Sequence, residues 1–369
     1  MLYRSILRPL LFRLSPETAH NFALQTLTKA LSPRWIRNLA ARRYSKPLFG
    51  ELMRFGLAFP NPIGVAAGFD KNGIAVEGLA SLGFGFVEVG TVTHLAQPGN
   101  PRPNLFRLPL DRALINRQGF NNLGAAALAD QFASHRPNCV LGINIGKSRA
   151  VEIENAGADY LATFDLVYPH ADYIVVNVSS PNTPNLRDLQ RADSLGPLLF
   201  ALQKRNEELS TNHHGNPVPL LVKIAPDLSL PELEAVVDVV QRANLSGIIA
   251  TNTTTHRDGL RSPSALVRAC GDGGLSGAPL GQRSTEIISS LYRLTNGRIP
   301  IIGVGGVFTA RDAWEKICAG ASLVQIYTGL VYQGWGIARD INNGLAEILK
   351  REGIESLDDA VGIKSKAKG

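Results

Sequence analysis

Cysteine is scarce in this chain of 369 residues. The three that occur, Cys139, Cys270 and Cys318, are odd in number, widely spaced and never arranged as C-x-x-C. This pattern excludes a disulfide framework and gives no indication of a zinc or iron–sulfur site. Because each cysteine lies among apolar or small residues, we expect buried thiols in a reducing compartment.

Long apolar runs are also lacking. No stretch reaches the ~20 residues that a membrane-spanning helix needs. Arg8 and Arg13 interrupt the N-terminal stretch that could have formed the core of a signal peptide. The sequence therefore predicts neither a membrane span nor a cleaved secretion signal.

Acidic residues are nearly missing from the start of the chain. Residues 1-50 contain nine Lys or Arg and one acidic residue, whereas residues 51-369 contain 29 basic and 30 acidic residues. The net charge of +7 thus belongs to one N-terminal segment, which argues against nucleic acid as a partner. An Arg-rich, acid-poor start also resembles a mitochondrial presequence, and that alternative stays open.

The N-terminal segment has the pattern of two short helices. Over residues 2-14 leucines and isoleucine recur at helical spacing with arginines between them, which predicts a basic amphipathic helix. Ser15-Pro16-Glu17 is typical of a cap followed by proline at the first helical position. We therefore expect residues 1-45 to form a small helical hairpin on a membrane surface, and residues 46-369 to form the catalytic domain.

Eight apolar runs alternate with helical patterns in the rest of the chain. The runs cover residues 62-67, 84-91, 139-145, 172-178, 219-225, 246-252, 300-305 and 322-327. The helical patterns include 122-134, 192-210, 230-243, 284-295 and 310-319. Apolar strands separated by helices indicate a parallel sheet buried on both faces, and eight such units predict a closed (β/α)8, or TIM, barrel of the α/β class.

Two further segments have distinctive compositions. Residues 92-120 are rich in Pro and Gly and too long for a plain connection between a strand and a helix. We expect them to form a loop that covers the site. Residues 353-369 are polar and are expected to trail without chemistry of their own.

Polar residues stand where the predicted strands end, and in such a barrel the active site lies at these ends. In chain order they are Gly68, Asp70 and Lys71; Thr91; Asn144, Gly146 and Lys147; Asn177 to Asn182; Lys223; Thr251 to Thr254; Gly305 and Gly306; and Tyr327 and Thr328. Amides, hydroxyls and lysines without a His, Cys or carboxylate cluster suit a planar, hydrogen-bonding heterocycle better than a metal ion. We expect no metal.

Two of these features indicate an anionic cofactor. Gly303-Val304-Gly305-Gly306 and Tyr327-Thr328 follow the seventh and eighth strands, where barrels commonly bind phosphate through backbone N–H groups. Lys223 lies inside an apolar run and needs an anionic partner. A reduced flavin or a phosphate would supply one, and an ion pair with a barrel carboxylate is the alternative.

With these residues in place, the chain resembles the dihydroorotate dehydrogenases, specifically the membrane-associated class 2 that passes electrons to quinone. The motifs that carry the resemblance extend over nearly the whole chain: Ala66 to Lys71, Gly90 to Thr93, Asn116 to Asn122, Asn144 to Lys147, Asn177 to Asn182, Lys223 to Asp227, Thr251 to Thr254, Gly273 to Gly277 and Ile302 to Gly306. The resemblance implies oxidation of (S)-dihydroorotate to orotate, with FMN as hydride acceptor and a membrane quinone as final acceptor, in de novo pyrimidine biosynthesis.

The resemblance also implies which residues bind each ligand. FMN would contact Ala66, Ala67, Gly68, Phe69, Asp70, Thr91, Asn144, Asn177, Lys223, Thr251, Gly277, Gly306, Tyr327 and Thr328. Dihydroorotate would be held by Lys71, Asn116, Arg117, Gln118, Gly119, Phe120, Asn177, Asn182, Asn252 and Thr253. Asparagine amides match the donors and acceptors of a pyrimidine ring, and Lys71 can pair with the substrate carboxylate.

Ser180 matches the position of the catalytic base, where the soluble class 1 enzymes have cysteine. A free serine is a poor base, so this role requires a site that excludes water and offers a proton relay from the hydroxyl. Lys223 would stabilise negative charge on the reduced flavin.

The resemblance places the quinone near the N-terminal segment. His20 and Arg107 would lie close to the quinone end of a tunnel. The hairpin would hold the protein peripherally at the cytoplasmic face of a bacterial cell membrane, with the mitochondrial inner membrane as the alternative.

Two other functions fit part of the pattern. A soluble flavin barrel could use fumarate or NAD, but the basic hairpin and Ser180 argue against it. A non-enzymatic protein could bind anionic lipid through the hairpin with the barrel as scaffold. Eight strand ends with polar residues argue against that alternative.

Overall fold

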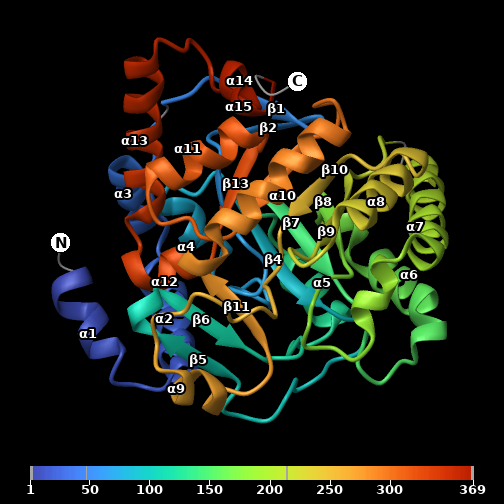
Figure 1. Ribbon diagram of the computed structural model, residues 1–369, viewed down its shortest axis with the longest axis horizontal. Helices are drawn as coiled ribbons and strands as arrows, with labels where there is room; N and C mark the ends of the chain where they lie inside the picture. Colours follow the sequence, from blue (N-terminus) through green and yellow to red (C-terminus); the bar gives the residue numbers. More distant parts are fainter. Residues whose placement is uncertain (1–2, 47, 213–214, 367–369) are drawn as a thin grey trace.

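Eight parallel strands close into a barrel in the computed structural model, which describes residues 3–46, 48–212 and 215–366 (Figure 1). The strands are β3 (Ile63–Val65), β4 (Phe86–Val92), β7 (Val140–Ile145), β8 (Tyr173–Asn177), β9 (Leu220–Ile224), β10 (Gly247–Ala250), β12 (Ile301–Val304) and β13 (Leu323–Ile326). Pairing of β13 with β3, with Val324 opposite Ile63, closes the ring. Each predicted apolar run coincides with one of these strands, with β4 extending one residue beyond its run, so the predicted TIM barrel is confirmed.

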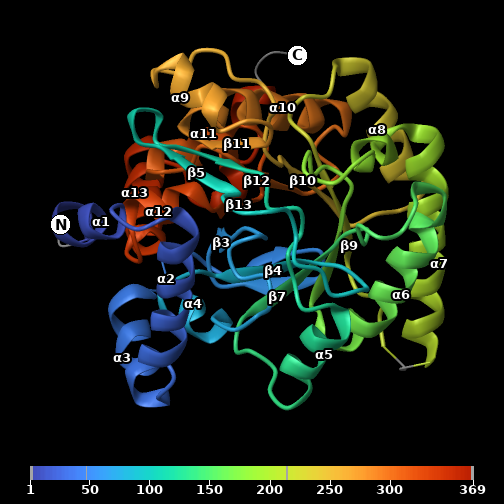
Figure 2. The same ribbon diagram turned by 90° about the horizontal axis from the view of Figure 1, so that it is seen from below.

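Helices surround the barrel because each strand is apolar on both faces and needs an outer cover. They are α4 (Val76–Ser81), α5 (Ala125–Ala133), α6 (Ala156–Val167), α7 (Ala192–Asn212), α8 (Leu230–Arg242), α10 (Gly281–Leu294), α11 (Ala310–Ala319) and α13 (Ile337–Glu352). Shorter elements are η3 (Ile153–Asn155), η4 (Tyr168–His170), η5 (Leu186–Gln190), α9 (Ser264–Ala269), η6 (Ala278–Leu280) and α12 (Thr328–Gln333). All five predicted helical patterns are helices, and successive helices from α5 to α8 pack side by side (Figure 2).

Aromatic rings fill the barrel at the amino ends of its strands. A hairpin of β1 (Leu52–Arg54) and β2 (Leu57–Phe59) places the ring of Phe59 edge-on against Phe86, with 5.3 Å between centroids. Glycines make room for the rings: a Cβ on Gly64 would overlap the ring of Phe86, and one on Gly142 would overlap that of Tyr173. This end is therefore packed core, and polar groups are left to the carboxyl ends of the strands.

The segment 92-120 contains β-structure, contrary to the expectation of a loop. β5 (Leu105–Leu108) and β6 (Ala113–Asn116) form a hairpin around η2 (Pro109–Asp111), and β11 (Gly274–Gly277) joins it as a third strand. Strands of four residues between prolines give little periodicity, and β11 lies far away in the chain. This sheet forms a fixed wall beside the barrel mouth.

The N-terminal segment has more helices than expected. A π-helical turn, η1 (Tyr3–Leu7), runs into α1 (Arg8–Leu11), and then come α2 (Pro16–Ala30) and α3 (Arg34–Tyr44). The Ser15 hydroxyl accepts a hydrogen bond from the Thr18 amide, as the predicted cap requires. The sequence did not predict α3, which lacks a capping side chain and has no fully buried residue. None of the helices in the described ranges is long and apolar enough to cross a membrane.

The C-terminal residues are anchored. α14 (Leu357–Ala360) buries Leu357 and Ala360, and α15 (Ile363–Lys366) follows it. The Ser365 hydroxyl donates to the Ala319 carbonyl at 3.0 Å, which ties this segment to the end of α11. The expectation of a trailing tail is therefore wrong up to residue 366, because its few apolar residues dock against the barrel helices.

Glycine at position 142 is a testable requirement of barrel packing. Gly142→Ala should lower the free energy of unfolding by about 1–3 kcal/mol, because the new methyl group overlaps Tyr173. Gly157→Ala is the matched control, since a Cβ there meets nothing within 4 Å. Denaturant unfolding of both variants checks the prediction, and equal stability would contradict it.

Candidate active site

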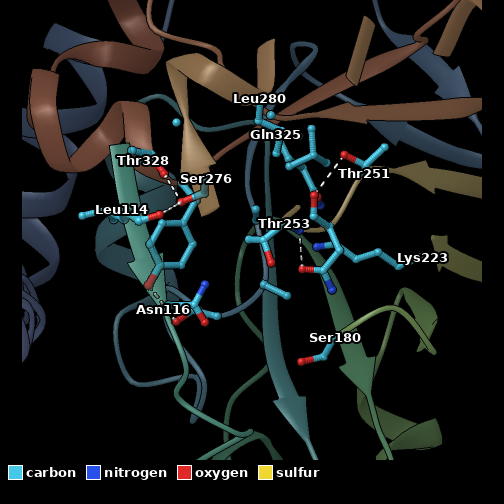
Figure 3. A pocket seen from close by; sticks show the side chains of 18 of the residues that line it. Leu114, Asn116, Ser180, Lys223, Thr251, Thr253, Ser276, Leu280, Gln325 and Thr328 are labelled. Carbon is cyan, nitrogen blue, oxygen red and sulfur yellow. Dashed lines mark hydrogen bonds between the residues drawn. The ribbon is translucent and has the colours of Figure 1, made fainter. Parts of the chain in front are cut away.

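A cavity of about 990 Å³, including the space open to solvent at its mouth, lies at the carboxyl ends of the strands. Most of the predicted site residues line it: Ala66, Ala67, Gly68, Lys71, Thr91, Asn116, Gln118, Gly119, Phe120, Asn177, Ser180, Asn182, Lys223, Thr251, Asn252, Thr253, Gly277, Gly306, Tyr327 and Thr328. Figure 3 shows Lys223 and Thr251 on one side and Asn116, Ser276 and Thr328 on the other. The volume is in the range of a cofactor site.

Three predicted site residues do not line the cavity but support the residues that do. Asp70 accepts hydrogen bonds from the amides of Ile74 (3.0 Å) and Ala75 (2.7 Å), so it shapes the turn before α4. Phe69 packs edge-on against Tyr327, with 5.7 Å between ring centroids. Asn144 lies beneath Thr91, whose hydroxyl donates to the side-chain Oδ1 of Asn144 at 2.6 Å.

The structure does not bring the side chain of Arg117 to the cavity. Its guanidinium donates to the carbonyls of Cys270 (2.8 Å) and Pro103 (3.1 Å) and lies over the ring of Phe106. Arg117 thereby braces the loop after α9 against the β5–β6 hairpin. The sequence places it directly after Asn116, the last residue of β6, but its side chain is directed to these two carbonyls and not to the cavity.

Lys223 faces a buried carboxylate, which is the alternative that the sequence left open. Its Nζ lies 3.9 Å from Oε1 of Glu88, and both side chains are buried. Burial lowers the pKa of Lys223, and the charge of Glu88 opposes that shift. The sequence reasoning missed Glu88, although a single acidic residue inside the apolar run 84-91 carried the same signal as Lys223.

The loop that carries Ser180 is held by an arginine. The Ser180 hydroxyl accepts a hydrogen bond from the Asn182 amide at 3.2 Å. Arg187 donates to the carbonyls of Ser179 (3.1 Å) and Thr253 (2.9 Å) and to the carboxylate of Asp227 (2.7 Å). Arg187 therefore joins two loops of the cavity, and sequence reasoning did not identify it.

Lys71 points at amide oxygens at the cavity edge. Its Nζ donates to Oε1 of Gln118 at 2.8 Å and to Oδ1 of Asn121 at 2.5 Å. Burial lowers the pKa of Lys71 to about 7. An anionic ligand beside it would favour the charged form and raise that pKa again.

Glycines form a backbone cradle at the ends of β11 and β12. Gly306 has φ +72°, and a Cβ there would overlap the Cα of Gly281. Nearby, the hydroxyls of Ser276 and Thr328 are 2.8 Å apart. Thr328 and Gly329 open α12, so their amides have no partner within the helix. Backbone N–H groups at such close approach suit a phosphate.

Two buried polar atoms of the lining have no hydrogen-bond partner among the described residues. They are Oγ1 of Thr253 and Oε1 of Gln325. Buried polar atoms in folded proteins nearly always have a partner. A ligand with polar groups would supply the partners that these two atoms lack. The described part of the chain contains no cluster of three or more His, Cys, Asp or Glu suited to a metal.

His20 and Arg107 lie outside the central cavity. The ring of His20, on α2, stacks edge-on against Phe69 with 5.2 Å between centroids and lines a second cavity that Lys71 also touches. Burial, with the charge of Lys71, lowers the pKa of His20 to about 4, so it is neutral at pH 7. Arg107, on β5, donates to the Leu14 carbonyl at 2.8 Å.

Glu17 connects the N-terminal helices to this wall, a role that the sequence did not indicate. Its Oε1 accepts hydrogen bonds from the amides of Asn104 (2.8 Å) and Leu105 (3.2 Å) at the start of β5. Because the carboxylate is buried and charged, these bonds are of the stronger kind. Glu17 thus fixes α2 relative to β5.

Comparison with known proteins gives the family. The family model described as dihydroorotate dehydrogenase matches residues 51–349. The chain belongs to the dihydroorotate dehydrogenase family. Relatives named dihydroorotate dehydrogenase (quinone) include those of Gloeobacter violaceus, 53% identical over 98% of both chains, and Roseiflexus, 50% identical over 97% of this chain and 98% of the relative.

Solved structures of this family agree with the fold. The dihydroorotate dehydrogenase of Eimeria tenella in complex with ferulenol has a TM-score of 0.85 and 39% identity, and the match covers 95% of each chain. Its ligand-free form has the same score over 95% of this chain and 99% of that one. The resemblance read from the motifs is thereby confirmed at the level of the family.

The role of Arg187 in this family member can be tested by hydrogen exchange. Arg187→Met removes three charge-assisted bonds, so amides of residues 178–182 and 252–255 should exchange roughly tenfold faster or more. Arg191→Met is the control, because its ion pair with Asp193 is exposed and 3.6 Å long. Unchanged exchange in the Arg187 variant would show that the loops are held by other contacts.

Proposed function

We propose that this chain oxidises (S)-dihydroorotate to orotate, with FMN as hydride acceptor and a membrane quinone as final electron acceptor, in de novo pyrimidine biosynthesis. The observation that carries the proposal is that Ser180, Lys71 and several asparagines line the same cavity. The backbone of Gly277 and Gly306 lines that cavity as well. The curated relatives of about half identity are named as quinone-dependent dihydroorotate dehydrogenases.

The residues of the cavity fit FMN. The backbone at Gly277 and Gly306, with the start of α12, would hold the phosphate. The backbone from Ala66 to Gly68, with Thr91 and Thr251, would border the ring system. When bound, FMN supplies a hydride acceptor that can pass electrons on to a quinone. Lys223 would place positive charge beside the ring, where negative charge arises on reduction.

The substrate would lie on the side of the cavity bordered by Lys71 and the asparagines. Lys71 would pair with the carboxylate, since its ammonium group has only neutral amide oxygens as partners in the described structure. Asn116, Asn182 and Asn252 present amides toward the same space, and Asn182 donates to Asn116 at 3.0 Å. These amides would recognise the ring N–H and C=O groups.

Ser180 would remove the ring-carbon proton. Ser180 is only 6% exposed, so its hydroxyl group has little access to bulk water. Its oxygen accepts a hydrogen bond from the Asn182 backbone amide. When the oxygen takes the substrate proton, the hydroxyl proton would pass to water at the open mouth of the cavity. A serine in this environment depends on the loop geometry that Arg187 maintains.

The N-terminal segment would bring the protein to a membrane. Large apolar side chains of this segment are exposed to solvent: Ile6, Leu10, Leu14, Phe22, Trp35 and Leu39. With the surplus of basic residues, they would give the segment a surface suited to a lipid interface. We propose residues 1–45 as the membrane and quinone-access segment and 46–369 as the catalytic domain, at the cytoplasmic face of a bacterial membrane or, alternatively, at a mitochondrial inner membrane. His20 and Arg107 would border the quinone path.

The decisive experiment is the visible spectrum of the purified protein, before and after dihydroorotate is added without oxygen. We expect a yellow protein whose flavin absorbance is bleached by the substrate and restored by a quinone analogue. A colourless protein or an unreactive flavin would refute the proposal. Restoration by fumarate or NAD, but not by quinone, would favour the soluble flavin barrel.

Ser180→Ala should slow flavin reduction by about a hundredfold or more, because the variant lacks the base. Anaerobic stopped-flow absorbance measures this step. Reoxidation of the reduced flavin by quinone is the internal control and should keep its rate. A normal reduction rate would remove Ser180 from the role of base.

The double variant Trp35→Ser/Leu39→Ser should bind lipid vesicles at least about tenfold more weakly, because each replaced side chain would bury apolar surface in the bilayer. Trp35 and Leu39 are 69% and 61% exposed on α3. Phe200→Ser is the control: Phe200 is 42% exposed on α7, across the barrel from α3 in Figures 1 and 2. Co-sedimentation with anionic vesicles measures binding, and equal binding of both variants would contradict the assignment of this surface.

A further inference from the structure

The floor of the cavity rests on one carboxylate. Glu88 is fully buried on β4. Its Oε1 accepts a hydrogen bond from Nδ2 of Asn144 at 2.8 Å, and its Oε2 accepts from Nε2 of Gln325 at 2.6 Å and from the Tyr173 hydroxyl at 3.3 Å. Lys223 lies 3.9 Å from Oε1. Donors from four other strands thus surround a group that can only accept.

A carboxylate fixes the orientation of a neighbouring side-chain amide. The carboxylate can only accept hydrogen bonds, so the amide must direct its NH2 group, and not its oxygen, toward it. Asn144 must direct its NH2 group to Glu88, so its oxygen faces Thr91 and Asn177, which donate to it at 2.6 and 3.1 Å. Gln325 must do the same, and its free oxygen is one of the two buried atoms of the described lining that have no partner. Both amides therefore turn an oxygen away from Glu88.

The orientation continues to the loop of the base. Asn177 directs its NH2 group to Asn144, so its own oxygen accepts from the amide and hydroxyl of Ser179 at 3.2 and 3.0 Å. Asn252 donates to the Ser179 hydroxyl at 3.0 Å. Two amides therefore connect Glu88 to the residue next to Ser180.

The same carboxylate is the counter-ion of Lys223. Among the described residues, Glu88 is the carboxylate within 4.0 Å of this lysine. Burial favours the neutral amine and lowers the pKa of Lys223, whereas Glu88 favours the charged form. Without Glu88, burial alone would act on this amine.

We propose that Glu88 is a positioning residue: it fixes which atoms of Asn144 and Gln325 face away from the barrel core, and it keeps positive charge on Lys223. This inference rests on the proposed function. The resulting floor offers the amide oxygen of Gln325 and the ammonium group of Lys223. It selects a planar ligand that donates N–H groups and gains negative charge on reduction.

The sharpest test exchanges the carboxylate and the amide. In Glu88→Gln, the new NH2 group meets that of Asn144 or Gln325, so one amide must turn over. In Asn144→Asp, two carboxylates face each other. In the double variant, the amide now at position 88 donates to the carboxylate now at position 144. That carboxylate still accepts from Thr91 and Asn177, so every one of these bonds regains a donor and an acceptor. Non-additivity between positions in contact is the expected signature.

We expect Glu88→Gln and Asn144→Asp each to bind FMN at least about tenfold more weakly than wild type, measured by fluorescence quenching on reconstitution of the apoprotein. The double variant should melt at a higher temperature and bind FMN more tightly than Asn144→Asp alone. Tyr173→Phe, which loses only the longest bond to Glu88 and keeps the ring volume, is the control and should bind FMN as wild type does.

Additive effects of the two substitutions, or wild-type FMN binding by Glu88→Gln, would overturn the inference. If Glu88→Gln does not fold, the comparison between the double variant and Asn144→Asp decides by itself: a double variant no more stable than Asn144→Asp refutes the role of Glu88. Failure of the proposed function is separate, because it appears as wild-type protein that binds no FMN, and the melting temperatures still test the orientation of the amides.

Discussion

Lys223 and Glu88 are buried together inside the barrel, so the polar residues around them must hydrogen-bond to one of the two charged groups. A charge removed from water is tolerated only when it is paired and hydrogen-bonded. Asn144 and Gln325 satisfy the carboxylate, and the lysine remains directed at the cavity that it lines. The polarity of the site follows from this pair, because each amide that serves Glu88 is left with one possible orientation.

The division of the barrel into two halves makes room for such a pair. Near the amino ends of the strands, Phe59, Phe86 and Tyr173 fill the interior above glycines that have no side chain to offer. Toward the carboxyl ends, short polar side chains replace the rings. Tyr173 belongs to both halves, since its ring packs over Gly142 and its hydroxyl reaches Glu88. The site is therefore supported from below by close-packed core.

The segments outside the barrel give the cavity its walls and connect it to the proposed membrane surface. The sheet of β5, β6 and β11 borders the cavity through Leu114, Asn116 and Ser276. Its first strand is attached to α2 through Glu17. A helix of the proposed lipid-binding segment and a strand that touches the cavity are thus linked by one buried carboxylate, which gives the proposed quinone path a fixed geometry.

The sequence by itself determined the barrel and the types of chemistry in it. Continuous apolar runs predict buried parallel strands, and a charged residue inside such a run, as at Lys223, predicts a buried partner. Family motifs located most of the cavity lining. Tertiary structure alone decided which partner Lys223 has, that Arg117 turns outward, that Arg187 joins two loops, and that residues 113–116 pair with 274–277. These features depend on contacts between residues far apart in the chain. The local periodicity of a sequence shows only which side of each helix or strand is buried and which is exposed to solvent.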